Sequence, residues 1–278
     1  MLEKIFKLQN ILLEMGKIIG IISLKGGVGK TSIVSSLGAA ISGFDKKVLV
    51  IDGNLSTGTL GLHLNVIEPD VTLNHVLGRK ANITEAIYKL KNFDVIFSSM
   101  FKQIKVNPLK LKDKIKSLKR KYDFILLDSS PSLDEETLAV MLASDELFVL
   151  TTPDYPTLNA TLRAIKLAKQ RGTKIDGLII NKVHNKNFEI SVNDIETTAE
   201  IPVMAVIPYD IRILKALSKF NFCVNCNPRS AASTEIKKLA AVLVGEEYKP
   251  FSLKNLFRII PEKQEINREL FYESVFEN

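Results

Sequence analysis

Residues 23–32 of this chain read Ser23-Leu24-Lys25-Gly26-Gly27-Val28-Gly29-Lys30-Thr31-Ser32, and this stretch decides the fold. The apolar run before it, residues 17–22, predicts a buried strand, and the small and apolar side chains of residues 33–41 follow at helical spacing. A strand, a glycine-rich loop and a helix in this order are the setting of a phosphate-binding loop. Because glycines let successive backbone N–H groups surround a phosphate at the start of a helix, we expect a nucleotide to bind here.

Two lysines frame this loop. Lys30 stands where a P-loop lysine contacts the terminal phosphates, and the Thr31 hydroxyl stands where Mg²⁺ is bound. Lys25, just before the first glycine, is not part of the ordinary P-loop pattern. The sequence Lys-Gly-Gly-Val-Gly-Lys-Thr at 25–31 resembles the deviant Walker A box of the MinD/ParA family of dimerising ATPases. That resemblance implies ATP and Mg²⁺ as ligands, and it implies that Lys25 reaches the nucleotide of a partner subunit, so that ATP joins two chains.

Length and composition indicate a globular protein with one main domain. The 278 residues, 46% hydrophobic and 25% charged, fit one α/β domain with appendages. No apolar run is long enough to cross a bilayer, a signal-peptide cleavage pattern is missing, and two cysteines make no disulfide framework, so we expect a cytoplasmic protein. The formal net charge of +7 indicates an anionic partner, either nucleic acid or lipid headgroups.

Two further predicted strands end in carboxylates. The apolar runs 47–52 and 122–128 finish at Asp52 and Asp128. Catalytic groups of open α/β sheets gather at the carboxyl ends of parallel strands, so both acids are well placed. The second run resembles a Walker B segment, in which Asp128 would hold Mg²⁺ through water. The first aligns with the family's Asp-x-Asp switch segment, whose first acid supports the Mg²⁺ shell.

Asn54 replaces the second acid of that switch segment. In the family this acid orients the attacking water. An amide cannot accept a proton, but it can hold a water by hydrogen bonding, and phosphoryl transfer depends mainly on positioning and charge stabilisation. We therefore expect ATP hydrolysis that is slow or depends on a partner.

The base of the nucleotide is expected beside two later strands. Residues 177–182 form a predicted strand ending in Asn181-Lys182, and residues 201–207 form another, followed by Pro208-Tyr209-Asp210. In the family an Asn at the first place reads the adenine edge, because an amide both donates and accepts, and the loop after the last strand flanks the base. The predicted catalytic residues are Lys25, Lys30, Asp52 and Asn54; the Mg²⁺ residues are Thr31, Asp52 and Asp128; the nucleotide-binding residues are Lys25, Gly26, Gly27, Val28, Gly29, Lys30, Thr31, Ser32, Asn181, Lys182, Pro208, Tyr209 and Asp210.

Strands alternate with helical segments along most of the chain. This alternation predicts an α/β fold with a doubly wound, mainly parallel sheet flanked by helices, the P-loop NTPase class. Thr72 and Thr84 are predicted to cap short helices over 73–77 and 85–90. We expect an N-terminal extension at 1–14, a MinD/ParA-like ATPase domain at 15–248 and a C-terminal amphipathic tail at 249–278.

The tail begins with a basic amphipathic stretch. On a helical wheel one face carries Leu253, Leu256, Phe257 and Ile260, and Lys254 and Arg258 lie opposite. Such a helix can lie in a membrane interface, and the MinD branch of the family carries a C-terminal sequence of this kind. An acidic stretch with its own apolar stripe follows at 262–278, which would either mask the first segment or bind a partner. Residues 1–14 carry a rough helical stripe, read as a mis-assigned start, a helix lying on the domain, or a membrane or dimer element.

The sequence thus favours a MinD-like, ATP-dependent dimerising switch that cycles on and off an anionic membrane. Such a switch would position a cellular process such as cell division, with an activating or cargo protein as a further partner.

Three rival functions remain. Eight lysines and one arginine against one acid between residues 102 and 121 are compatible with a ParA-type, DNA-binding partition ATPase. Cys223 and Cys226 are compatible with an iron–sulfur carrier or with two structural thiols. Asn54 is compatible with a module that holds ATP without turnover.

Overall fold

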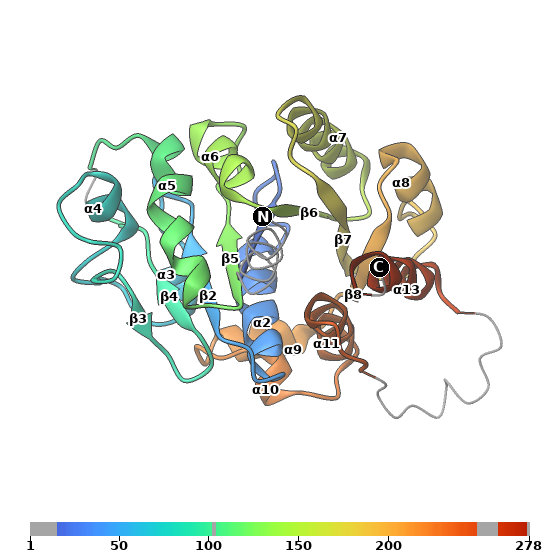
Figure 1. Cartoon of the computed structure of the whole chain (residues 1–278). Helices are drawn as coiled ribbons and strands as arrows, with labels where there is room; N and C mark the ends of the chain where they lie inside the picture. The colour runs from blue at the N-terminus through green and yellow to red at the C-terminus, as the bar shows by residue number, and fades with distance from the viewer. Residues whose placement is uncertain (1–15, 102–103, 249–260, 277–278) are drawn as a thin grey trace, which may run out of the picture.

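The computed structural model describes residues 16–101, 104–248 and 261–276, and its strands form one eight-stranded sheet in the order β3-β4-β2-β5-β1-β6-β7-β8. All neighbouring strands pair in parallel except β3 and β4, which are antiparallel. The predicted doubly wound, mainly parallel fold is confirmed (Figure 1). The strands are β1 (Lys17–Ile22), β2 (Val48–Asp52), β3 (Tyr88–Lys89), β4 (Asp94–Ile96), β5 (Phe124–Asp128), β6 (Glu146–Thr151), β7 (Ile175–Val183) and β8 (Val203–Pro208).

Helices cover both faces of the sheet, so there are two apolar cores (Figure 1). Side chains of β1 point to both faces of the sheet: Ile18 and Ile22 pack in one core, and Ile19 and Ile21 pack in the other. This explains why the parallel strands read as continuous apolar runs. One core is covered by α4 (Leu73–Leu77), α5 (Leu111–Ile115), α6 (Glu135–Ala143), α7 (Tyr155–Gln170) and α8 (Val192–Ala199), and the other by α2 (Lys30–Ser42), α3 (Leu60–His63), α10 (Cys223–Cys226), α11 (Ala231–Val244) and α13 (Lys263–Phe276).

The helix ends follow local capping chemistry. Asp154 accepts a hydrogen bond from the Thr157 N–H at the start of α7, and Ser230 does the same for the Ser233 N–H at the start of α11. Gly245, at φ 76°, ends α11 in the left-handed region. Thr72 stands at the N-cap of α4, as expected.

The predicted helix over 85–90 is wrong. Within these residues Tyr88–Lys89 form β3, which pairs with β4 at the edge of the sheet. The Tyr88 ring packs edge-on against Phe97, with the ring centroids 5.4 Å apart. A helix of six residues is too short to be stable by itself. Pairing with β4 and the contact with Phe97 therefore stabilise this segment more than a short helix would.

The basic segment before β5 is helical, in short pieces. It consists of a 3₁₀ turn (Pro108–Lys110), α5 and a second 3₁₀ segment (Lys116–Arg120). Leu111, Ile115 and Leu118 are buried against the sheet, so the lysines between them face outward. The segment therefore has both a packing role and a basic outer surface.

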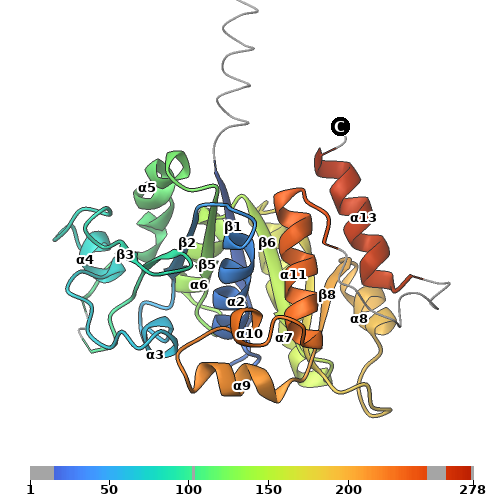
Figure 2. The ribbon, with the colours of Figure 1, turned by 90° about the horizontal axis from the view of Figure 1, so that it is seen from below.

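The acidic C-terminal stretch folds onto the domain as α13, which packs against β8 and α11 (Figure 2). Arg268 is its anchor: Nη1 lies 2.7 Å from Glu235 Oε1 and donates to the Met204 carbonyl at 2.9 Å, and both charged side chains are buried. Phe271 joins the core beside α11, whereas Ile266 and Leu270 are exposed. The predicted membrane residues Leu253, Lys254, Leu256, Phe257, Arg258 and Ile260, like the extension 1–14, lie outside the described residues.

Candidate functional site

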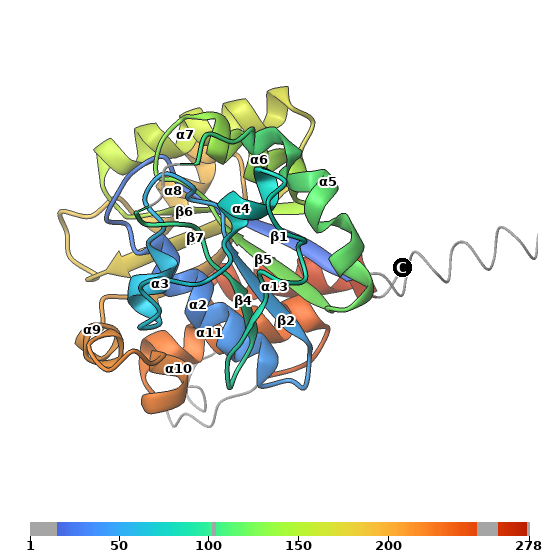
Figure 3. The ribbon, with the colours of Figure 1, turned by 90° about the vertical axis from the view of Figure 1, so that its left-hand side faces the viewer.

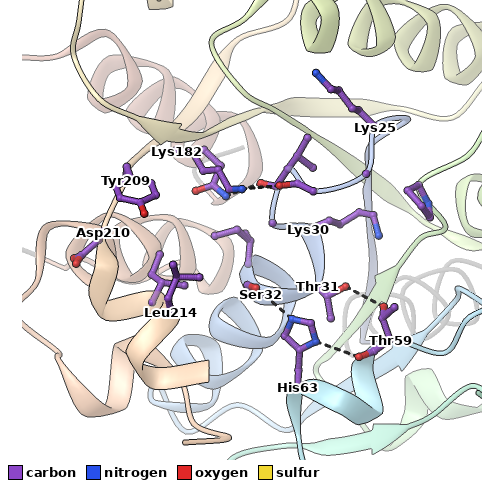
Figure 4. Close-up of a pocket in the computed structure, with 18 of the residues that line it drawn as sticks. Lys25, Lys30, Thr31, Ser32, Thr59, His63, Lys182, Tyr209, Asp210 and Leu214 are labelled. Carbon is purple, nitrogen blue, oxygen red and sulfur yellow. Dashed lines mark hydrogen bonds between the residues drawn. The ribbon is translucent and has the colours of Figure 1, made fainter. Parts of the chain in front are cut away.

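A cavity of about 410 Å³ opens at the carboxyl ends of the central strands (Figure 4). The loop between β1 and α2 forms its floor, and β7, the loop after β8 and α9 (Ile211–Leu217) form one wall. Figure 3 shows α3 and α9 at this same end of the molecule. Of the predicted nucleotide-binding residues, all thirteen line this cavity: residues 25–32, Asn181, Lys182 and 208–210.

The glycine-rich loop is held by two side chains of β7 that also line the cavity. Asn181 Nδ2 donates to the Val28 carbonyl at 2.8 Å, and Lys182 Nζ donates to the Gly27 carbonyl at 2.6 Å. Lys182 has a φ of 60°, in the left-handed region, which is uncommon for a residue with a side chain. These two contacts fix the loop at the start of α2, where backbone N–H groups can meet an anion.

Asp128 joins the loop to the next strand. Its carboxylate accepts from Lys30 Nζ at 2.7 Å and from Thr31 Oγ1 at 2.6 Å, and Lys30 also donates to the Ser129 carbonyl. Both Lys30 and Asp128 are buried. In this structure Lys30 is therefore engaged with the predicted Walker B acid, and contact with a terminal phosphate requires its ammonium group to exchange partners.

Asp52 lies beside Asp128 because β2 and β5 pair with these two residues in register. The Asp52 carboxylate accepts from the Asn54 and Leu60 N–H groups, both at 3.0 Å. Complete burial and the charge of Asp128 raise the pKa of Asp52 to about 7, although these N–H groups and Lys30 oppose the shift.

Mg²⁺ fits this donor set. The ion prefers hard oxygen ligands, and the Thr31 hydroxyl, Asp128 and Asp52 supply them within one buried corner. Two adjacent buried carboxylates are also a place where added positive charge is favourable, which the raised pKa of Asp52 reflects. Asn54 lines the cavity next to this corner and is 5% exposed, so the residue at the switch position faces the site.

Lys25 does not point into the cavity. Figure 4 shows it directed away from Lys30, and its Nζ lies 3.3 Å from Asp154 Oδ1. Burial alone would raise the pKa of Asp154, but hydrogen bonds from Thr152, Thr157 and Lys25 lower it below the ordinary value. The two side chains are 42% and 43% exposed, so this ion pair contributes at most about 1 kcal/mol to stability.

Four wall residues could not be found from local sequence. Thr59, His63, Ile213 and Leu214 line the cavity from α3, its N-cap and α9. His63 Nδ1 donates to the Thr59 carbonyl at 3.1 Å, and Nε2 lies 3.4 Å from Ser32 Oγ. The histidine is hydrogen bonded within the fold, but it belongs to the wall of the site.

The two cysteines do not converge on a shared metal site within the chain. Cys223 is buried and accepts from the Ser233 hydroxyl at 3.3 Å, whereas Cys226 is exposed. Within residues 16–101, 104–248 and 261–276, no group of His, Cys, Asp and Glu side chains is arranged to hold a metal ion. In the same ranges no helix has the length and apolar composition needed to span a bilayer.

Known proteins resemble this chain over most of its length. A family model described as an AAA domain matches residues 16–176. The septum site-determining protein MinD of Thermotoga maritima is 30% identical over 244 residues, 84% of this chain and 89% of that protein. The cell division ATPase MinD of Pyrococcus furiosus superposes with a TM-score of 0.77 at 36% identity, over 81% of this chain and 97% of that one. The septum site-determining protein MinD of Pyrococcus horikoshii, solved with Mg-ADP, superposes with a TM-score of 0.78 at 32% identity, over 88% of this chain and 100% of that one.

The geometry of the loop predicts a specific defect for Gly29→Ala. Gly29 has a φ of 92°, and a Cβ placed on it would lie 2.6 Å from the buried Asn181 Nδ2 that holds the loop. We expect the affinity for Mg-ADP, measured by titration calorimetry, to fall at least about tenfold because the Asn181 contact must break.

Gly172→Ala is the matched control for this variant. Gly172 also has a positive φ, 68°, but nothing lies within 4 Å of the added Cβ. The control is expected to lose about 1–2 kcal/mol of unfolding free energy and to keep its Mg-ADP affinity. Equal affinities for the two variants would contradict the assignment of this loop.

Proposed function

The chain belongs to the MinD/ParA family of ATPases with a deviant Walker A loop, and on that premise we propose that it is an ATP-dependent switch whose two copies join face to face across their nucleotides. The observation that carries this proposal is the position of Lys25. It lies at the rim of the cavity and is directed away from Lys30, and among the described residues its ammonium group has one half-exposed ion pair, with Asp154. The free energy needed to break this ion pair, so that Lys25 can contact a second chain, is therefore at most about 1 kcal/mol.

The surface around Lys25 supports pairing of two copies. A second hollow of about 330 Å³ lies on the outer side of the loop and includes Lys25, Asp154 and Phe188. Phe188 is 76% exposed and Tyr155, next to Asp154, is 77% exposed. Large exposed aromatic side chains beside a charged loop are typical of a surface that is covered in an assembly.

ATP and Mg²⁺ are the ligands that this proposal requires. Thr31 would hold Mg²⁺ directly and Asp52 and Asp128 through water, and the ion would offset the charge of the phosphates. The loop N–H groups and Lys30 orient the triphosphate, and Lys25 of the partner copy adds positive charge where the terminal phosphate leaves. A second chain over the site excludes water, which strengthens these charge contacts.

We propose that hydrolysis is slow because Asn54 stands at the switch position. Its amide can hold a water in the cavity but cannot take a proton from it. Hydrolysis would separate the two copies and end the bound state of the switch.

The surface on which the switch acts is proposed to be an anionic membrane. The support is the basic amphipathic sequence at 249–260, and two joined copies would present two such segments, which strengthens weak binding. Nucleic acid is the second candidate, because the exposed lysines of residues 104–121 form a basic surface. A cytoplasmic protein that binds the membrane peripherally, with an activating or cargo protein as partner, fits the first candidate.

Lys25→Ala is expected to abolish ATP-dependent pairing. Wild type with a slowly hydrolysed ATP analogue should double its mass in light scattering, and the variant should stay single, because it lacks the side chain that reaches across. Its affinity for Mg-ADP should change less than about threefold, since Lys25 points away from the cavity. Lys80→Ala, at an exposed lysine that lines neither the cavity nor the hollow beside Lys25, should pair like wild type. Pairing of Lys25→Ala, or a wild type that stays single, would refute the proposal.

Asn54→Asp is expected to raise the turnover rate at least about tenfold, because a carboxylate can both orient the water and accept its proton. The rate is measured as phosphate release at saturating ATP and Mg²⁺, since the ion offsets the added charge beside Asp52. Asn225→Asp, at an exposed position that lines neither the cavity nor the hollow beside Lys25, controls for the change of net charge. An unchanged rate would show that Asn54 does not limit hydrolysis.

Leu256→Gln together with Phe257→Gln is expected to reduce binding to vesicles containing phosphatidylglycerol at least about tenfold, because each change removes apolar area from the interface. Point changes are preferable to deletion of 249–278, which would also remove the packed helix α13. Leu270→Gln, at an exposed apolar residue of α13, is the matched control. If the double variant floats with vesicles as wild type does, the membrane proposal fails.

A further inference from the structure

The end of the sheet opposite the nucleotide cavity carries a hollow of about 560 Å³ lined by lysines. Three segments contribute to it: the end of α2 with the loop to β2, residues 84–94 around β3 and the start of β4, and the residues just before β5. The lysines are Lys46, Lys47, Lys89, Lys91 and Lys121.

The charge of this hollow is not neutralised by the described part of the chain. Within it, none of the five lysines has a carboxylate oxygen within 4 Å of its ammonium group. Asp94 is the one acid in the lining, and its Oδ2 accepts from the Tyr122 hydroxyl at 2.6 Å. Asp123, beside Lys121, accepts from the Lys47 backbone N–H at 2.6 Å. Both carboxylates are thus bound to neutral groups of the fold, and the lysines repel one another.

The remaining lining suits a compact ligand with polar edges. Ser42 and Thr84 bring hydroxyl groups and Asn92 brings an amide, while Ile87 and Phe93 add apolar surface. The volume lies in the range of small-molecule sites. Lysine binds phosphate as a mobile point charge, and several lysines converging from separate segments favour a group with more than one phosphate.

The hollow is remote from the P-loop. It lies where β2, β4 and β5 begin, since Leu49 pairs with Asp94 and Val48 with Phe124, whereas the nucleotide cavity lies where β1, β2 and β5 end. In Figure 2, β1 begins on the side of the molecule opposite α9. A ligand in the hollow therefore cannot be an extension of a nucleotide in the cavity.

We propose that this lysine hollow is a second anion site, for a multiply phosphorylated group such as a short polyphosphate chain or a phosphorylated lipid headgroup. In the bound state each ammonium group would be attracted to the negative phosphates, and this attraction would offset the repulsion among the five ammonium groups. The site goes beyond the proposed ATP switch and does not depend on pairing or hydrolysis.

Titration calorimetry with inorganic tripolyphosphate, at fixed free Mg²⁺ and with saturating Mg-ADP to fill the P-loop, tests the site. Wild type is expected to bind one equivalent, with an affinity that falls as salt rises. Lys47→Gln, Lys89→Gln, Lys91→Gln and Lys121→Gln combined should weaken this binding at least about tenfold and leave Mg-ADP affinity unchanged. The control carries the same charge change at four exposed lysines that do not line the hollow, Lys80, Lys166, Lys186 and Lys219, and should bind tripolyphosphate within about twofold of wild type.

A vesicle arm distinguishes the two sources of the phosphates. If the hollow variant also loses binding to vesicles containing phosphatidylinositol 4-phosphate, and the control does not, the source is a headgroup; tripolyphosphate binding without such a loss indicates a soluble ligand. A wild type that binds no tripolyphosphate when Mg-ADP fills the P-loop, or equal weakening in both variants, would overturn the site. Loss of duplex DNA binding by the hollow variant, with no tripolyphosphate binding, would overturn it in favour of a polynucleotide surface.

Discussion

The contact of Asp128 with Lys30 and Thr31 is the constraint on which the rest of the site depends. It joins the end of β5 to the start of α2, and it needs β5 to lie between β1 and β2. That strand order also brings Asp52 beside Asp128, so the loop lysine, the hydroxyl and both acids share one buried corner. The two β7 side chains that hold the loop carbonyls complete the arrangement from the other side. A site for a phosphate and a cation thus follows from the order of four parallel strands.

Much of this arrangement could be predicted because its determinants are local. The loop, the apolar runs and the acids at their ends are short patterns, and parallel strands bring their carboxyl ends to one edge whatever lies between them. Asn181 lies on the cavity wall for this reason, and here its amide donates to the Val28 carbonyl.

What could not be predicted depends on contacts between distant segments. Tyr88 belongs to a strand only because β4 and Phe97 are beside it. His63 and Leu214 reach the cavity wall because α3 and α9 pack at the same end of the sheet, and nothing near them in sequence indicates this. The lysine hollow is assembled from three separate segments of the chain, and the sequence of each alone is typical of an ordinary solvated surface.

The packing of α13 changes what the segment before it can do. Tyr248 is in contact with Phe44, at a ring-centroid distance of 6.5 Å, and α13 is anchored through Arg268, so the twelve residues 249–260 are attached to the domain at both ends. The segment that we propose to bind a membrane is therefore not a free end of the chain, because α13 follows it and is part of the fold. Removing α13 would leave the Glu235 carboxylate without the charge of Arg268, so a shortened chain is expected to lose stability as well as its tail.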